Sequence, residues 1–190
     1  MQTFDLNTIK QWERFYRANF INSLTGFKSA SLIGTYHANG IANLGVFSNI
    51  IHIGADPALI GFINRPIAAA PHTIQNIEQQ KHYTINSIHS NFIEKAHQCS
   101  AKYAETVSEF AAVGLTELTV EGINAPFVAE SMVKYALELV EIVPIKHNGT
   151  FLVIGAVQMA IIDENLLGND GFLHLEKAST VCSLGIDGYY

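Results

Sequence analysis

Few cysteines, few basic residues and no long apolar run characterise this sequence of 190 residues. Its two cysteines, Cys99 and Cys182, lie far apart without a C-x-x-C pair, which argues against a disulfide framework and a zinc knuckle. Eleven basic and seventeen acidic side chains give a formal net charge of −6, without a basic stripe for nucleic acid. No stretch approaches the roughly 20 apolar residues that span a bilayer. We therefore expect a cytoplasmic protein that binds neither nucleic acid nor membrane, and charged Asp5, Lys10 and Glu13 argue against a signal-peptide core.

The familiar catalytic motifs are missing as well. Neither G-x-G-x-x-G nor G-x-x-x-x-G-K-[ST] occurs, so the Rossmann dinucleotide fold and P-loop chemistry lack their signatures. Ser131 has no flanking glycines, which leaves a hydrolase nucleophile elbow unsupported. None of the eight histidines forms an H-E-x-x-H motif or has a second histidine three or four residues away. A metal site is then possible only if histidines far apart in the sequence converge, and we expect none.

Apolar residues make up 48% of the chain, enough for a sizeable core, and we expect a single domain. Residues 7–22 place Ile9, Trp12, Tyr16 and Phe20 on one side of a predicted amphipathic helix that begins at residue 7 or 8. Such an apolar stripe ordinarily packs against the core. The alternative is that its aromatic side chains cover a partner subunit.

Strands are predicted through the middle of the chain. Apolar runs at residues 31–34, 43–47, 50–53 and 59–63 are separated by Gly, Asn and Asp-Pro, which punctuate turns between strands. Residues 132–143 alternate apolar and polar side chains up to Pro144, and residues 150–162 are apolar and β-branched. Because Asn148-Gly149 favours a tight turn, residues 132–162 are predicted to form a long antiparallel hairpin.

Shorter elements interrupt these strands. Spacing of apolar residues predicts helices over residues 91–104 and 106–112, with Gly114 ending the second. Short strands are expected over residues 115–120 and near residues 172–175. No internal repeat is visible.

A candidate phosphate site lies between the fourth apolar run and the next strand. Arg65 is followed by Thr73, a natural N-cap for a short helix that ends near Gln80. Free N–H groups at a helix start, beside a guanidinium group, suit a phosphate. Taken singly, Arg65 is better explained as a solvated turn residue and Thr73 as a cap only.

The passage from residue 30 to residue 190 resembles the flavin reductase-like, FMN-binding split-barrel family through several short motifs in the family's order. These are Asn43-Leu44-Gly45-Val46-Phe47-Ser48, Asp56-Pro57-Ala58-Leu59, Arg65 with His72-Thr73 and Asn76-Ile77, Tyr83-Thr84-Ile85-Asn86, Glu109-Phe110 with Gly114-Leu115, Pro126 with Glu130-Ser131, Ile154-Gly155-x-Val157, Gly185 and Tyr189.

This resemblance implies the fold: mainly β, a Greek-key antiparallel split barrel with peripheral helices. It makes residues 1–190 one domain with an N-terminal helical extension over residues 1–28. It also implies a homodimer with FMN at the subunit interface, each site drawing residues from both chains.

The resemblance further implies a set of FMN-binding residues that meet three needs of the cofactor. The phosphate needs cations and N–H groups, the ribityl chain and pyrimidine edge need donors and acceptors, and one ring face needs an apolar wall. The candidates are Asn43, Val46, Phe47, Ser48, Asn49, Arg65, His72, Thr73, Asn76 and Asn86. Glu130 and Glu138 are expected to be hydrogen-bonded supports in the barrel.

The function implied is an FMN-dependent oxidoreductase that takes hydride from NADH or NADPH and passes electrons to free flavin or a small acceptor. A flavin explains the lack of catalytic motifs, since its ring carries the hydride itself. Alternatives are a non-catalytic FMN carrier or store, and a ligand-free assembly module.

Three departures from the family pattern bear on this choice. Ala156 stands where a glutamate is expected, no arginine lies near Gly185, and the Gly-Asp-His element that serves nicotinamide has only a loose counterpart at residues 168–174. Flavin binding survives these departures better than the use of a particular reductant does.

Overall fold

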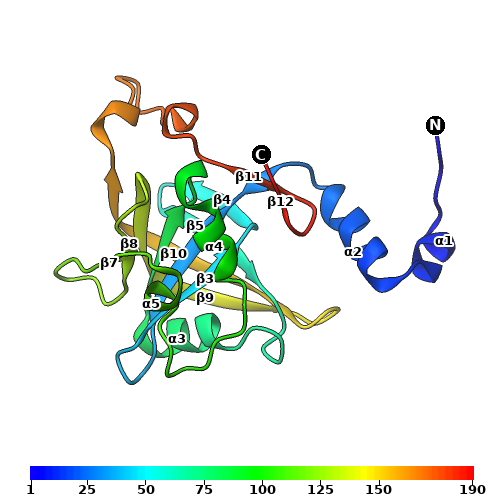
Figure 1. The fold of residues 1–190 in the computed structure, drawn as a ribbon, viewed down its shortest axis with the longest axis horizontal. Coiled ribbons are helices and arrows are strands. Elements are labelled where there is room, and N and C mark those ends of the chain that lie inside the picture. The colour runs from blue at the N-terminus through cyan, green and yellow to red at the C-terminus, as the bar shows by residue number, and fades with distance from the viewer.

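The computed structural model describes residues 1–190, and a seven-stranded antiparallel sheet forms its centre (Figure 1). Its strand order is β3-β2-β6-β9-β10-β5-β4. The edge strands β3 and β4 follow one another in the sequence, joined by Ser48 and Asn49, but are not paired with each other. The strands are β2 (Ser31–Tyr36), β3 (Ala42–Phe47), β4 (Ile50–Ala55), β5 (Ala58–Asn64), β6 (His82–Ser87), β9 (Val133–Ile145) and β10 (Thr150–Ile162). This architecture confirms the predicted mainly β split barrel.

Two small sheets and several short helices surround the barrel. The small strands are β1 (Lys28–Ser29), β11 (Cys182–Leu184) and β12 (Gly188–Tyr189), which form one sheet, and β7 (Glu117–Leu118) and β8 (Phe127–Val128), which form another. The α-helices are α1 (Leu6–Gln11), α2 (Arg14–Ser23), α3 (His72–Gln80), α4 (Ile93–Gln98) and α5 (Glu109–Val113), with 3-10 helices at Ser90–Phe92, Glu164–Leu166 and Leu175–Ala178. None of the helices is long and apolar enough to cross a membrane.

The strands separate two apolar cores because their side chains alternate between the two faces. Ile33, Phe62 and Val153 point into the barrel, where Ile74 and Ile77 of α3 join them. The other core lies outside strands β2 and β3, beneath α4 and α5, and its members are Ala30, Leu32, Ala42, Leu44, Ile88, Phe92, Ala96, Cys99, Phe110, Leu115, Val128 and Val181. Helix α3 therefore closes the barrel interior, and α4 and α5 cover its β2–β3 side.

Several predicted boundaries were wrong. The helix expected over residues 91–104 is a 3-10 turn followed by α4, which ends at Gln98, and the strand expected over residues 115–120 is only β7. Near residues 172–175 only an isolated bridge from Leu173 to Leu167 is found. Gly114, by contrast, ends α5 in the left-handed conformation, as predicted.

The predicted 132–162 hairpin is confirmed, with two differences. Pro144 lies inside β9, paired with Phe151, instead of ending the strand. This is tolerated because β6 pairs only with residues 134–138 of β9, so one edge of β9 is open at Pro144, where no N–H is needed. The turn spans residues 146–149, longer than a two-residue turn, with Gly149 at a φ of 72°.

The N-terminal segment is helical but differs from the single helix predicted over residues 7–22. Asp5 caps α1 by accepting from the Thr8 N–H, and Glu13 caps α2 by accepting from the N–H groups of Phe15 and Tyr16. The chain is extended at Trp12, between the two helices. Neither helix contains a buried residue, so the expected core packing of this stripe is also wrong.

Candidate functional site

A buried polar network links strands β2 and β3 to helix α3. The Oγ1 of Thr35 accepts from Nδ2 of Asn43 at 3.1 Å and from Nδ2 of Asn76 at 2.9 Å. Nδ2 of Asn43 also approaches Oγ1 of Thr73 at 3.4 Å. These four residues are at most 7% exposed. Three of the predicted flavin residues, Asn43, Thr73 and Asn76, are thus brought together, although they lie up to 33 positions apart in the sequence.

Thr35, at the centre of this network, was missed by the sequence reasoning. It pairs directly with Asn43 across the β2–β3 ladder. The sequence does hold one signal for a site residue here, since Thr35 is a polar residue that directly follows the apolar positions of its strand. Only the pairing register shows that it faces Asn43.

Helix α3 starts differently from the prediction. Its N-cap is Pro71, no side chain caps it, and Thr73 lies inside the helix with its hydroxyl directed to Asn43. The predicted capping role of Thr73 is therefore wrong, while the helix end at Gln80 is confirmed. Because nothing caps the first turn, its N–H groups remain open to an anion.

The loop that precedes α3 carries Arg65 and is held by one buried amide. Asn64 is fully buried, and its Nδ2 donates to the carbonyl oxygens of Arg65 at 2.7 Å and Ala70 at 3.2 Å. Both ends of the loop thus lie within reach of one side chain. Arg65 itself is exposed and forms no ion pair within the chain. Its guanidinium group is free to bind an anion.

His72, the first residue of α3, belongs to a second polar group beside the network. Its Nε2 lies 3.7 Å from Oε1 of Glu105, and its ring meets that of His37 edge-on, with centroids 5.2 Å apart. Burial lowers the pKa of His37, and the neighbouring His72 lowers it further. A hollow of about 230 Å³ adjoins these residues and is lined by His37, Ala38, Asn39, Gln75, Asn76, Gln79 and Glu105. His37 and Glu105 were not among the predicted site residues.

Glu109 is a buried carboxylate on the other side of β3. One of its oxygens accepts from the backbone N–H of Leu44 at 3.0 Å, so it ties the start of α5 to the strand. Burial raises its pKa, against the lowering effect of that hydrogen bond. This carboxylate holds β3 in place from outside the barrel.

The end of β3 and the following turn offer the candidate wall and polar contacts for a ring. Val46 packs on the outer core and Phe47 on the barrel core, where its ring meets Phe62 edge-on at 5.0 Å. Ser48 is half-buried and Asn49 is exposed. β3 also lies close to α3 at Gly45, where an added Cβ would be only 3.3 Å from Oγ1 of Thr73.

Asn86 forms hydrogen bonds with other partners than the network around Thr35. It is fully buried on β6, where Nδ2 donates to the Leu32 carbonyl and to Thr84, and Oδ1 accepts from the Val128 N–H. Both ends of its amide are occupied by neighbouring strands. Its place in the structure is that of a link between β2, β6 and β8.

Of the two carboxylates expected to be hydrogen-bonded supports of the barrel, Glu130 forms such bonds and Glu138 is exposed on a strand. Glu130 accepts from the N–H of Thr116 with both oxygens, at 3.0 and 3.1 Å, and so supports the segment before β7. Glu138 is an exposed residue of β9. No cluster of three or more His, Cys, Asp or Glu side chains in residues 1–190 could hold a metal ion.

A model for the "Flavin reductase like domain" family matches residues 28–180. The crystal structure of a protein from Shewanella frigidimarina NCIMB 400, described as a proposed flavin reductase with a split barrel domain, is 45% identical; the alignment covers 100% of this chain and 94% of that one, with a TM-score of 0.96.

Two more distant structures share the fold. Nitrilotriacetate monooxygenase component B from Bacillus cereus is 18% identical over 100% of this chain and 95% of its own, with a TM-score of 0.88. The FMN-binding protein from Thermus thermophilus with bound 1-cyclohex-2-enone is 17% identical over 86% of this chain and 85% of its own, with a TM-score of 0.71.

Proposed function

The chain belongs to the flavin reductase like domain family, and from that premise we propose that it is an FMN-dependent oxidoreductase, which takes hydride from NADH or NADPH and passes electrons to free flavin or a small acceptor. One observation carries the proposal. The unpaired guanidinium of Arg65 and the uncapped first turn of α3 lie at the two ends of one short loop held by Asn64.

We assign the phosphate of FMN to this loop. Arg65 would supply a charge-assisted hydrogen bond, and the N–H groups at the start of α3 would supply further donors. His72 and Thr73 are placed at the same helix start, and Asn76 lies one turn further along. Thr35 and Asn43 would position this end of the site by holding Thr73 and Asn76 from the strand side.

We assign the ring to the end of β3. Val46 and Phe47 point to opposite faces of this strand, so Phe47, on the same face as Gly45 and Thr73, would form its apolar wall, and Ser48 and Asn49 would bond its polar edge. Bound FMN would supply the hydride chemistry, since the flavin ring accepts and donates hydride itself. The side chains of this chain then need only bind the flavin, orient it and keep water from one face.

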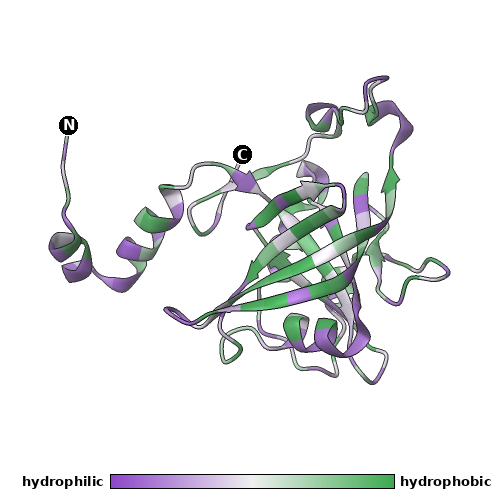
Figure 2. Cartoon of the chain, turned by 180° about the vertical axis from the view of Figure 1, so that it is seen from behind, coloured by the Kyte–Doolittle hydropathy of each residue, from purple (hydrophilic) through white to green (hydrophobic).

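A second copy of the chain is part of the proposal. The outer face of the sheet at β4 and β9 leaves Ile51, Ile53 and Val140 between 41% and 56% exposed. Figure 2 shows this side, with apolar colours along its strands and no helix across them. Neither Arg65 nor residues 46–49 line the hollow beside His37. A flavin ring placed at the end of β3 would therefore lie outside this hollow, and its second face would need a wall from another chain. We propose a homodimer, with FMN at the interface, in the cytoplasm, where the two free cysteines suit a reducing medium.

Titration of FMN, with flavin fluorescence as the readout, tests the assignment. Arg65→Ala should weaken FMN binding by about 1.5–3 kcal/mol, the value of a hydrogen bond to a charged group. Riboflavin, which lacks the phosphate, should bind both proteins equally. Lys177→Ala, which removes an exposed cation in the C-terminal part of the chain, is the control and should leave both affinities unchanged. Failure of the wild-type protein to bind FMN would refute the proposal.

One observation favours the non-catalytic alternative, an FMN-binding electron carrier or flavin store. The loose counterpart of the nicotinamide element, residues 168–174, lies in the C-terminal segment, on the side of the barrel away from α3 (Figure 1). Its His174 is bonded through Nδ1 to Glu176 at 2.9 Å. Steady-state oxidation of NADH and NADPH with FMN present separates the two functions: turnover above the rate with FMN alone favours the reductase, and its absence with both donors favours the carrier.

A further inference from the structure

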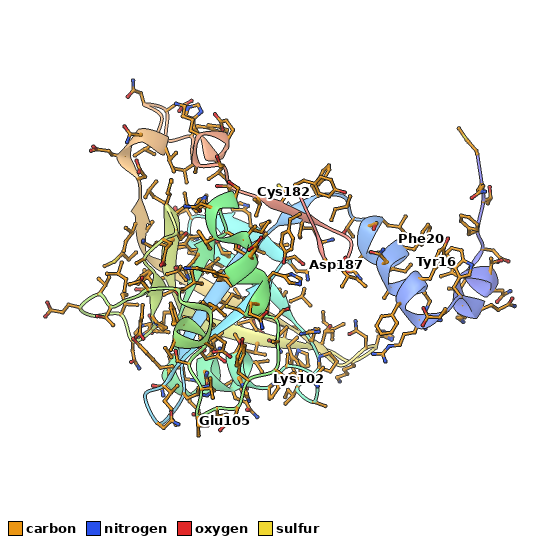
Figure 3. The ribbon with its side chains drawn as sticks, viewed as in Figure 1. Tyr16, Phe20, Lys102, Glu105, Cys182 and Asp187 are labelled. Atoms are coloured by element: carbon orange, nitrogen blue, oxygen red, sulfur yellow. The ribbon has the colours of Figure 1, made fainter.

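Residues 1–27, which we call the N-terminal arm, extend away from the barrel (Figure 1). Figure 3 shows Tyr16 and Phe20 on α2, well separated from the barrel side chains. The arm lies outside the residues that the family model matches. It is nevertheless included in the alignment with the Shewanella crystal structure, which covers the whole chain. The extended arm is therefore a feature common to both proteins.

Four aromatic side chains of the arm pack on one another, and Phe27 at the base of the arm meets Tyr190 edge-on, with ring centroids 5.4 Å apart. Trp12 meets Phe4, Tyr16 and Phe20 edge-on, with centroids 4.9–5.0 Å apart. This small cluster stiffens the connection between α1 and α2. It leaves a large apolar surface uncovered, since Leu6, Phe15, Tyr16, Leu24 and Phe27 are 62–68% exposed and Ile21 is 46% exposed. Exposed large apolar side chains in this number on a short arm indicate an interaction site.

The charge distribution favours the barrel of a second copy as the occupant. The arm carries three basic and two acidic side chains, whereas residues 28–190 carry eight basic and fifteen acidic ones. A basic arm is thus attracted to the acidic barrel of another copy and not to another arm. The barrel also has its own uncovered apolar face, at Ile51 and Ile53 of β4 and Val140 of β9.

We propose that the arm is exchanged between two copies of the chain, with its apolar side chains seated on the outer sheet face of the partner's barrel. Each copy then covers the apolar surface that the other leaves exposed, in a closed two-fold arrangement. This inference rests on the proposed homodimer but not on flavin binding. It assigns the arm, which is absent from the family match, to assembly.

The first test measures the dimer dissociation constant of full-length variants by sedimentation equilibrium. Phe15→Asp with Leu24→Asp places two charges on the apolar surface of the arm. Because both substitutions place a charge where an apolar side chain would be buried, the dissociation constant should rise at least about a hundredfold. Asn7→Asp with Gln11→Asp adds the same charge at exposed polar positions of the arm, so it removes only the charge attraction and should raise the constant less than about tenfold. The melting temperature of the isolated monomer should be equal in both variants, since the arm has no buried residue.

The second test identifies the contact directly. A photo-cross-linking benzoylphenylalanine at position 16 is introduced in chains of natural and heavy isotope composition, which are mixed before irradiation. Cross-links from the arm of one isotope to β4, β9 or β10 of the other support the exchange. Cross-links confined to one chain, or running from arm to arm, overturn it.

The outcomes also separate this inference from the proposed function. A dimer with the same dissociation constant in both double variants overturns arm exchange and leaves the homodimer intact. A wild-type chain that is monomeric overturns both the exchange and the homodimer. A monomeric wild-type chain would also remove the partner's share of the proposed flavin site, whereas the comparison of FMN with riboflavin in Arg65→Ala still tests the phosphate loop of one chain.

Discussion

Thr35→Val should destabilise the protein strongly, although it changes neither size nor burial by much. The hydroxyl of Thr35 accepts from two buried amides, and its loss leaves the Nδ2 groups of Asn43 and Asn76 without that acceptor. Asn43 and Asn76 are each only 3% exposed, so water cannot replace the lost bond. An unsatisfied buried donor costs about 1–3 kcal/mol, and Asn43 keeps only its long 3.4 Å contact with Thr73. We expect the free energy of unfolding to fall by about 2–4 kcal/mol.

Far-UV circular dichroism in urea is the suitable assay. Tryptophan fluorescence is not, because the single tryptophan, Trp12, lies in the N-terminal arm and not in the barrel. The melting temperature should fall by about 5–15 °C. Thr35→Ser keeps the acceptor and should retain most of the stability, and Thr25→Val, at an exposed position, should cost less than about 0.5 kcal/mol. A loss below 0.5 kcal/mol in Thr35→Val, or an equal loss in Thr35→Ser, would refute the reasoning.

Three further predictions concern other buried groups. A Cβ on Gly155 would overlap the hydroxyl of Tyr83, which is buried and has no hydrogen-bond partner. Gly155→Ala should therefore lower the free energy of unfolding in urea by about 1–3 kcal/mol. A smaller loss in the Tyr83→Phe background would identify that clash as the cause. Burial raises the pKa of Glu109, so the folded state binds this proton more tightly than the unfolded state and wild-type stability falls as pH rises above 4.5. Glu109→Gln should therefore gain stability relative to wild type as pH rises above 4.5, and no pH trend in the difference would contradict this. Asn64→Ala should weaken binding of FMN but not of riboflavin, and equal losses for both ligands would show that the amide does not act through the phosphate loop.

Local patterns predicted elements wherever the signal lies within a few residues. Apolar runs broken by turn residues located β2, β3, β4 and β5, and two β-rich stretches around Asn148-Gly149 located the β9–β10 hairpin. The end of α5 followed from Gly114, whose φ of 70° favours glycine at that position. In these cases one side chain or one alternation decides the backbone, and no distant residue can change the outcome.

Predictions that depend on distant partners were less successful. Pro144 continues β9 because β6 has already ended beside it, which no pattern within β9 reveals. One error was local instead: the helix over residues 7–22 breaks at Trp12 because Glu13 caps a new helix by accepting from the N–H groups of Phe15 and Tyr16. The arm stays uncovered although its apolar stripe is typical of core helices. Periodicity shows that a face is apolar but not what covers it.

The sequence by itself determined the kinds of residue in the candidate site and the elements that carry them. It supplied Arg65, His72, Thr73 and Asn76 on a loop and helix, and Asn43 on a strand. Only the tertiary structure decided that Asn43, Thr73 and Asn76 meet around Thr35, while Asn86 is enclosed by other strands. The physical reason is that hydrogen bonds between strands and helices far apart in the chain depend on pairing register, and register is set by the packing of the whole barrel.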